Sequence, residues 1–263
     1  MISPSNLPRI SIITVNYNCI DFLGSCLDSV ESQTYPNIEH IVVDGGSSDG
    51  CVELLKSRVN STRIDLVSSD NGIYDAMNKG IQIASGHIIG FLNSDDVFAS
   101  DHIISDIANR FVSDSSICCV YGSVHYVSRD NTFKKLRKHL AFPLTPFYVA
   151  LGFFPPHPAF YCLKDCIVEL SGFNTDFKIA ADADLLSRFS IHFPSSYSII
   201  DKNVVLMRIG GTSNNSLANI VRGNKEIILS LKTNFRSFNL FFFLFVKILY
   251  RSFLYFLFFL KGF

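Results

Sequence analysis

Short apolar runs alternate with segments of helical periodicity in the first 113 residues. Apolar, β-branched runs at 10–17, 38–43, 64–67 and 87–92 predict four buried strands. Apolar residues recur at helical spacing after the first run, where one helix face would carry Leu23, Cys26, Leu27 and Val30. Further helices are expected at 51–58, at 73–85 and from Ser100 or Asp101 onward. Strands and helices in alternation predict an α/β fold with a mostly parallel sheet.

The pattern changes after about residue 117. Two strands at 117–121 and 123–127 follow each other with little helix between them. The segment 142–158 is rich in proline and aromatic residues and is expected to form a loop that lines a site. Beyond it, the periodicity predicts helices at 182–193 and 217–231 and a strand at 204–208.

The segment 240–260 is almost wholly apolar. As a helix its 21 residues would be roughly 30 Å long, close to the thickness of a bilayer core. Lys247 and Arg251 lie in its middle, four residues apart and therefore on one face. A charge at the bilayer centre costs about 2.5–3.5 kcal/mol, so a helix in the membrane plane with these cations at the headgroups is favoured. A true span, a buried helix and a dimer-forming helix are the alternatives.

Composition limits the classes of function. Of the 263 residues, 48% are hydrophobic, which is enough for a sizeable core. The 23 basic residues equal the 23 acidic ones, so nothing favours nucleic-acid binding. All five charged residues beyond Glu226 are basic, which indicates different surroundings for the tail. The seven scattered cysteines and the lack of a signal-peptide pattern at the N-terminus favour a reducing, cytoplasmic setting.

Aspartates close two of the predicted strands. Asp44 follows the second run, and Asp95 with Asp96 follows the fourth. Ligands of open parallel sheets bind at the carboxyl ends of the strands. Gathered carboxylates repel each other unless a cation lies between them, and Mg²⁺ or Mn²⁺ with a bound diphosphate is the natural partner. A lone aspartate in such a place is more often a turn residue or a helix cap.

Five runs resemble, in order and spacing, the opening of glycosyltransferase family 2. They are SIITVNYN (11–18), SQTYPNIE (32–39), VVDGGSSDG (42–50), DNGIYDAMNKG (70–80) and FLNSDD (91–96). The resemblance covers roughly residues 10–100, weakens over 150–212 and is absent beyond about 230. It implies a GT-A (Rossmann-like) fold and inverting transfer from a nucleotide-diphosphate sugar.

The resemblance also implies roles for residues at the strand ends. The end of the first strand, with Thr14, Asn16 and Tyr17, and the aspartate Asp44 would hold the base and ribose of the donor. In the acidic run, Asp95 would face the ribose or diphosphate and share a metal ion with Asp96, the expected ligand. Asn93 would contact the donor as well; the family often has an acid there, so the metal would be held by one charge fewer.

Inversion needs a carboxylate opposite the leaving group, which removes the proton of the acceptor hydroxyl. The run AADADLL (180–186) resembles the late acidic motif of the family, whose first aspartate is this base. Asp182 is therefore the expected base, with Asp184 as its competitor. Two positions apart at a helix start, the two side chains point in different directions. The alternative role for Asp182 is a helix cap.

Three further residues are candidates for substrate binding. His157 falls where related sequences often carry a histidine, and it would touch acceptor or diphosphate. Arg208 precedes a glycine-containing loop (210–213) and could reach the diphosphate. Asp75, on the first turn of the helix at 73–85, would border the donor pocket. A structural histidine and a surface arginine are the alternative readings.

The sequence therefore predicts a GT-A domain over 1–212 and a helical tail over 213–263 that attaches the protein to a membrane. The expected activity is transfer of a sugar to a glycan or a polyprenyl-diphosphate-linked acceptor during surface polysaccharide synthesis. The expected location is the cytoplasmic side of the cell membrane, peripheral or monotopic, and a homodimer is possible. A sugar nucleotidyltransferase and a catalytically inactive scaffold of the same fold are the competing hypotheses.

Overall fold

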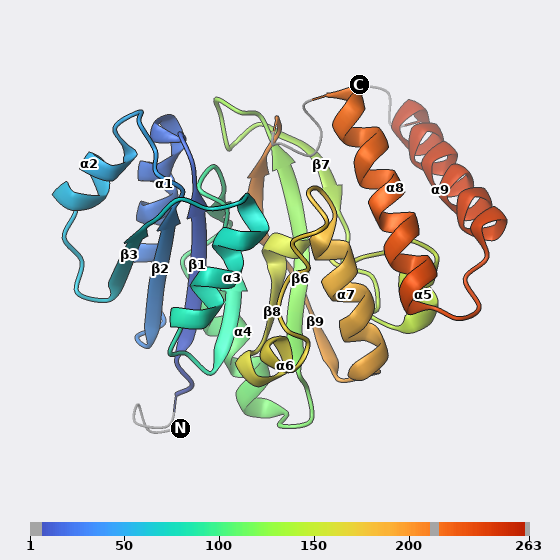
Figure 1. Cartoon of the computed structure of the whole chain (residues 1–263), viewed down its shortest axis with the longest axis horizontal. Helices are drawn as coiled ribbons and strands as arrows, with labels where there is room; N and C mark the ends of the chain where they lie inside the picture. Colours follow the sequence, from blue (N-terminus) through green and yellow to red (C-terminus); the bar gives the residue numbers. More distant parts are fainter. Residues whose placement is uncertain (1–6, 211–215, 261–263) are drawn as a thin grey trace.

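A mixed sheet forms the centre of the molecule, and helices cover both of its faces (Figure 1). The computed structural model describes residues 7–210 and 216–260. The strand order in the sheet is β3-β2-β1-β4-β8-β6-β9-β5, and β7 pairs with β6 outside this path.

The first four strands form the parallel part of the sheet that the sequence predicts. They are β1 (Ile10–Asn16), β2 (Ile38–Asp44), β3 (Arg63–Val67) and β4 (Ile88–Phe91). Parallel pairing of β1 with β2 sets Asn16 opposite Asp44, so these two polar residues meet at the carboxyl edge of the sheet.

Helices follow the parallel strands as expected: α1 (Ile20–Glu31), α2 (Cys51–Ser57), α3 (Ile73–Ile83) and α4 (Ile103–Ser113). The four apolar residues predicted to share one face of α1 are indeed its buried residues. Alternate residues of β1 face opposite sides of the sheet. Ile13 and Val15 pack in the core beneath α3, whereas Ile10 and Ile12 pack beneath α1 and α4. Both faces of the sheet are therefore buried.

Beyond β4 the sheet becomes mixed, and here several sequence expectations fail. The two strands expected at 117–127 are one strand, β6 (Cys119–Val127), whose register with β9 shifts around Ser123. The expected loop 142–158 contains the short helix α5 (Pro146–Ala150) and enters a 3-10 turn, η2 (His157–Ala159). The strand expected at 204–208 begins earlier, as β9 (Tyr197–Arg208). The remaining elements here are β5 (Val97–Phe98), β7 (Lys135–His139), β8 (Phe160–Leu163) and α6 (Lys164–Glu169).

Three helices end the described chain: α7 (Ala181–His192), α8 (Leu217–Asn234) and α9 (Leu240–Leu260). The α8 helix packs on α7, and α9 runs beside α8 (Figure 1). The predicted boundary between 212 and 213 falls outside the described residues. The hydrogen bonds between α7 and α8 nevertheless make α8 part of the support of α7.

The α9 helix lies against the protein with one stripe of its surface. Phe243 is buried in the main core, where its ring approaches Gly152, and Tyr250 contacts Phe142 and Phe153. Lys247 was expected at lipid headgroups, but its Nζ donates to Asn224 of α8 at 2.6 Å. The side chain of Arg251 lies outside the described residues. Within the described parts of the chain, no helix is both long enough and apolar enough to cross a membrane.

Candidate active site

The carboxyl ends of β1 and β2 are joined by the side chain of Asp44, which is completely buried. Its Oδ1 accepts hydrogen bonds from the backbone N–H groups of Gly46 (2.9 Å) and Ser47 (2.7 Å). Its Oδ2 accepts from Asn16 Nδ2 at 2.6 Å and from the Ser47 hydroxyl at 2.9 Å. Because the Asn16 amide donates in this direction, its buried Oδ1 remains an acceptor with no partner among the described residues.

Of the other predicted donor-site residues on β1 and α3, only Tyr17 has a widely exposed side chain. The ring of Tyr17 is 66% exposed beside the loop at Gly45. Thr14 is buried and shares a hydrogen bond of 2.9 Å with His40, so its position fits a role inside the sheet rather than contact with a substrate. Asp75 accepts from the N–H of Asn71 and pairs with Lys79 at 3.2 Å, which closes the loop before α3.

Asp95 and Asp96 follow β4, and Arg208 at the end of β9 holds both. One oxygen of the buried Asp96 carboxylate accepts from the backbone N–H of Arg208 at 2.9 Å, and the other accepts from Asn93 Nδ2 at 3.3 Å. The guanidinium of Arg208 donates to the backbone carbonyl of Asp95 and to Ser25. Arg208 is itself buried, so its position supports the acidic run directly.

Burial makes the charged form of this acidic pair costly. Desolvation raises the pKa of Asp95, and the charges of Arg129 and Arg208 oppose that rise. Desolvation and then the charge of Asp95 raise the pKa of Asp96 well above its ordinary range. The two differ in access, because Asp95 is only partly buried whereas Asp96 is completely enclosed. Asp95 is therefore the member of the pair that an ion or ligand can reach.

The acidic run suits a hard cation in donor chemistry. Asp95, Asp96 and Asn93 offer oxygen ligands, which Mg²⁺ and Mn²⁺ prefer, and a cation would relieve the cost of two neighbouring buried carboxylates. Across residues 7–210 and 216–260, no group of three or more His, Cys, Asp or Glu side chains is arranged to hold a metal ion.

Asp182 lies on the first turn of α7 with a partly exposed carboxylate. Its Oδ1 accepts from the backbone N–H of Ala183 at 2.9 Å and from the hydroxyl of Tyr74 at 3.3 Å. The same tyrosine hydroxyl donates to the carbonyl of Ile179 at 2.8 Å, which ties α3 to the start of α7. Within the described structure Oδ2 has no hydrogen-bond partner, so Asp182 retains a free oxygen.

Asp184 is in a different situation, with both carboxylate oxygens occupied. Oδ2 pairs with Arg188 Nε at 2.8 Å, and Oδ1 accepts from Ser230 at 2.9 Å and from Asn234 at 3.1 Å. Asp184 is 5% exposed and joins α7 to α8. Of the two candidates for the base, only Asp182 therefore has the access that proton transfer requires.

Glu226 of α8 holds the segment that leads into α7. Its carboxylate accepts from the backbone N–H groups of Lys178, Ile179 and Ala180 at 2.8–3.1 Å. Burial opposes ionisation of Glu226, but these bonds and the Arg222 side chain outweigh it and keep its pKa below 4.5. These bonds fix the backbone of the three residues that immediately precede α7. Glu226 carries no local sequence signal, because its partners lie 46–48 positions away.

His157 lies in a cluster of aromatic rings near Asp182. Its ring stacks on Phe91 at 5.0 Å and meets Phe173 edge-on at 5.4 Å, and Phe173 also stacks on Tyr74. Burial lowers the pKa of His157, and the charge of Asp182 partly offsets this. Its imidazole is therefore uncharged at neutral pH and packs among these rings. Its Nε2 has no partner among the described residues.

Tyr126 of β6 links the two acidic regions electrostatically. Burial raises its pKa, Arg137 opposes the rise, and the charges of Asp96 and Asp182 both add to it. Asp96 and Asp182 therefore lie within electrostatic range of one phenol, as expected for two parts of one site. A second residue missed in the sequence is Arg129, whose guanidinium lies 4.5 Å from the ring centre of Phe22 beside Asp95.

Comparison with known proteins identifies the family to which the chain belongs. The model of the family described as "Glycosyl transferase family 2" matches residues 11–169. Because this match spans more than half of the chain, the protein belongs to glycosyltransferase family 2, as the sequence runs indicated.

Curated relatives agree with this assignment. An uncharacterized glycosyltransferase of Mycobacterium tuberculosis is 30% identical over 188 residues, which are 71% of each chain. The chondroitin synthase of Pasteurella multocida is 32% identical over 128 residues, which are 48% of this chain and 13% of that protein. A PGL/p-HBAD biosynthesis glycosyltransferase of Mycobacterium bovis is 32% identical over 130 residues, which are 48% and 50% of the two chains.

Solved structures confirm the GT-A fold. TarS (residues 1–349) of S. aureus in complex with UDP-GlcNAc has a TM-score of 0.68 at 16% identity, and the match covers 84% of this chain and 66% of that one. The mannosyltransferase PcManGT of Pyrobaculum calidifontis, in complex with GDP-Man and Mn²⁺, has a TM-score of 0.64 at 18% identity. That match covers 89% of this chain and 66% of the other.

Proposed function

We propose that the protein transfers a sugar, with inversion, from a nucleotide-diphosphate sugar to a hydroxyl of its acceptor, and that Asp182 is the base. One observation carries the proposal: Asp182 keeps a free carboxylate oxygen at the helix start, whereas Asp184 has none. In the reaction Asp182 takes the proton of the acceptor hydroxyl while that oxygen attacks C1 of the donor sugar. The bond from C1 to the diphosphate breaks on the opposite face.

The donor lies at the carboxyl ends of β1, β2 and β4. Tyr17 offers an exposed ring for stacking on the base, and the unpartnered Oδ1 of Asn16 offers an acceptor. Asp44 stabilises the conformation of this edge through its four hydrogen bonds and does not contact the donor itself. The binding of UDP-GlcNAc by TarS and of GDP-Man by PcManGT, which share the fold, supports a nucleotide-sugar donor.

Mg²⁺ or Mn²⁺ binds at the acidic run together with the donor diphosphate. Asp95 provides the reachable carboxylate, and Asp96 stands behind it, held by Arg208 and Asn93. Small divalent cations are commonly bound through one or two carboxylates and the phosphates of a substrate, which suits this limited set. A cation bound there would supply positive charge that offsets the negative charge of the leaving diphosphate. The Mn²⁺ in the PcManGT complex supports this part of the proposal.

The acceptor is a glycan or a polyprenyl-diphosphate-linked glycan of a surface polysaccharide. The similarity to a chondroitin synthase and to a PGL/p-HBAD glycosyltransferase supports this class of acceptor. The outer stripe of α9 also supports it, because Phe241, Phe245 and Ile248 are exposed there at helical spacing. This stripe attaches the protein to the cytoplasmic face of the cell membrane, where a lipid-linked acceptor is found.

Nucleotide binding by calorimetry tests the proposal. UDP, GDP and dTDP are each titrated with and without Mn²⁺ into wild type, Asp95→Ala and the control Asp201→Ala, whose aspartate is exposed on β9. One diphosphate should bind with Mn²⁺ only, Asp95→Ala should weaken it about tenfold or more, and the control should match wild type. If wild type binds none of them, the proposal fails and the inactive scaffold becomes the leading hypothesis.

A further inference from the structure

The β6–β7 hairpin, residues 129–140, carries the densest positive charge in the described chain. Five of its first ten residues are basic, and only Asp130 is acidic. The basic residues are all exposed: Arg129, Lys134, Lys135, Arg137 and Lys138. None of the ion pairs within the described residues includes any of them. Arg129 acts on Asp95, so the charge that the hairpin presents outside any ion pair of the described residues is mainly that of Lys134, Lys135 and Lys138.

Lys138 and Arg137 lie on opposite faces of β7, because Lys138 pairs with His125 and Arg137 pairs with Tyr126. The guanidinium carbon of Arg137 lies over the ring of Tyr126, 4.1 Å from its centre. Burial lowers the pKa of His125, and the charges of Lys135 and Lys138 lower it further. Both lysines therefore lie close to the same part of β6.

Apolar side chains are interspersed with these cations. Phe133 at the hairpin turn is 93% exposed, and Leu136 and Leu140 are also exposed. A cationic loop that only had to stay soluble would not need an exposed phenylalanine at its tip. Basic residues mixed with exposed aromatic and aliphatic ones are typical of protein surfaces that rest on anionic lipid.

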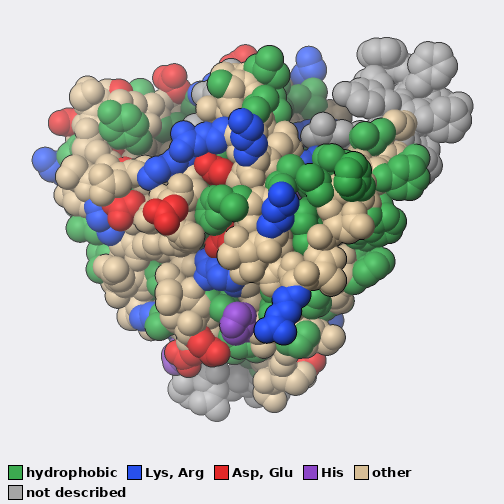
Figure 2. All heavy atoms as spheres, turned by 45° about the vertical axis from the view of Figure 1, so that its right-hand side comes forward, with side chains coloured by type: hydrophobic (Ala, Val, Ile, Leu, Met, Phe, Trp, Pro, Cys, Tyr) green, Lys and Arg blue, Asp and Glu red, His purple; other side chains and the backbone are tan. Residues whose placement is uncertain are grey.

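The segment that follows the hairpin packs against the protein-facing stripe of α9. Phe142, three residues beyond β7, contacts Tyr250 of α9 with the ring centres 5.9 Å apart. On the outer side of α9, Phe241 is 85% exposed and Ile248 is 64% exposed. Figure 2 shows Lys and Arg side chains among hydrophobic ones on the side of the molecule where the C-terminal helices lie.

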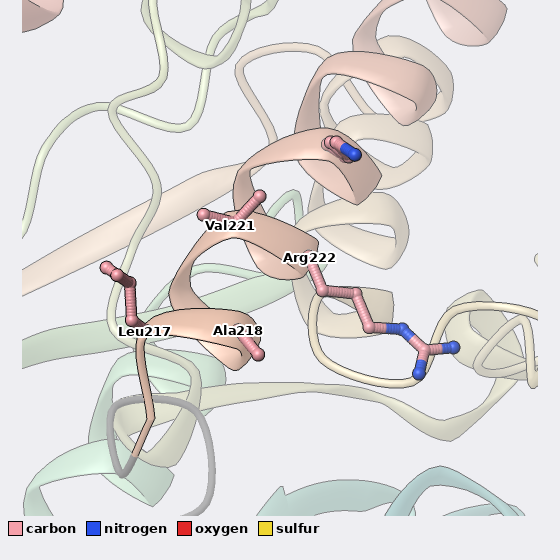
Figure 3. A pocket seen from close by; sticks show the side chains of 5 residues that line it. Leu217, Ala218, Val221 and Arg222 are labelled. Atoms are coloured by element: carbon pink, nitrogen blue, oxygen red, sulfur yellow. The ribbon is translucent and has the colours of Figure 1, made fainter.

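The start of α8 adds to the apolar surface. A shallow hollow there is lined by Leu217, Ala218, Val221, Arg222 and Lys225. Leu217 and Val221 point to one side of the helix, whereas Arg222 extends from the other (Figure 3).

We propose that the β6–β7 hairpin is a docking surface for an anionic lipid bilayer, and that it acts together with the outer stripe of α9. The proposal rests on the membrane attachment in the proposed function. It adds electrostatic binding of the hairpin lysines to the lipid headgroups. The apolar stripe enters the boundary between headgroups and acyl chains, while Lys134, Lys135 and Lys138 meet the headgroup phosphates. Charge complementarity selects this partner, because a neutral surface gives the unpaired cations nothing to bind.

Co-sedimentation of the full chain with vesicles tests the proposal. The vesicles contain phosphatidylcholine alone or mixed with phosphatidylglycerol. The test variant is Lys135→Gln/Lys138→Gln, and the matched control is Lys56→Gln/Arg110→Gln, which removes two exposed cations from α2 and α4. Nucleotide binding is measured on every variant, so that loss of the donor site is seen separately.

Wild type and the control should bind the anionic vesicles equally well, and the hairpin variant should bind about 30-fold more weakly. This difference should vanish at high salt, because exposed charges are screened there. Phe245→Ser/Ile248→Ser should weaken binding to both kinds of vesicle.

Equal binding of the hairpin variant and the control would overturn the proposal. Self-association of the hairpin variant with unchanged vesicle binding would also overturn it, because the lysines would then serve only to protect an edge strand. If wild type binds nucleotide but no anionic vesicles, the docking surface fails while the transferase proposal stands. If wild type binds anionic vesicles but no nucleotide, the transferase proposal fails and the docking surface is supported.

Discussion

At the carboxyl end of β2, Asp44 is held by the N–H groups of Gly46 and Ser47, two and three positions further along the chain. At the start of α7, the segment that leads to Asp182 is held by Glu226, a residue of α8 46–48 positions away. The conformation around Asp44 in the donor half is thus held by a local turn, whereas the base half depends on the packing of a later helix. Substitutions in α8 should therefore impair catalysis by Asp182 more than they impair donor binding.

Replacing the base should give the largest effect. Asp182→Asn keeps the size of the side chain and removes its basicity, so turnover should fall by about 10²–10⁴-fold. Nucleotide affinity should stay within about twofold, because the donor edge is formed by other strands. Release of nucleoside diphosphate from the donor measures the first quantity, and calorimetry the second. A variant that turns over normally would remove Asp182 from the mechanism.

Loss of Glu226 should damage the base half alone. Glu226→Ala frees the N–H groups of Lys178, Ile179 and Ala180, and a shift of about 1 Å at the base can cost about 10²-fold in turnover. Glu226→Gln keeps an acceptor oxygen and should recover part of the loss. The kcat should fall at unchanged donor KM, which separates positioning from general destabilisation. Arg222→Gln, which removes only the exposed ion-pair partner, is the control.

Asp184→Asn should affect stability more than chemistry. It breaks the pair with Arg188 in a nearly buried network, so the free energy of unfolding should fall by about 1–3 kcal/mol. Turnover per folded molecule should remain within a few-fold of wild type. Asp106→Asn, at an exposed ion pair with Lys202, should cost under about 0.5 kcal/mol. Urea unfolding measures both; a turnover loss like that of Asp182→Asn would make Asp184 the base.

For the donor half we predict a change in the pH dependence of stability rather than in turnover. Burial, and then the charge of Arg63, lowers the pKa of His40 from 6.5 to about 3. Between these values the unfolded chain binds a proton that the folded chain does not, so stability falls as pH drops below 6.5. The slope is at most about 1.4 kcal/mol per pH unit. In urea unfolding, His40→Gln should lose this part of the slope; an unchanged slope would contradict it.

The same contrast between local and long-range contacts explains which features the sequence could predict. The residues of β1, β2 and β4 and their aspartates were predicted because each signal lies in one short run. The alternation of Ile10 and Ile12 with Ile13 and Val15 reflects the two buried faces of the sheet. Asp182 was named, but its separation from Asp184 needed the bonds to Ser230 and Asn234 on another helix.

The features that the sequence could not predict depend on contacts between residues that are far apart in the chain. Thr14 was placed in the donor site because it belongs to a matched run, yet in the sheet it faces His40. Contact of Arg208 with the diphosphate stays a prediction, whereas its hydrogen bonds from β9 to the acidic run depend on long-range pairing that the sequence does not reveal. Glu226 carried no local signature because its partners are backbone N–H groups, which have no side-chain identity.

The anomeric configuration of the first sugar released from an α-linked donor tests the central claim most directly. Once calorimetry has identified the nucleotide, slow hydrolysis of the matching donor is followed by NMR, with water in place of the acceptor. A single base opposite the leaving group predicts that the first-formed sugar is the β-anomer, and that Asp182→Asn abolishes its formation. First formation of the α-anomer would mean retention, and it would contradict the role given to Asp182.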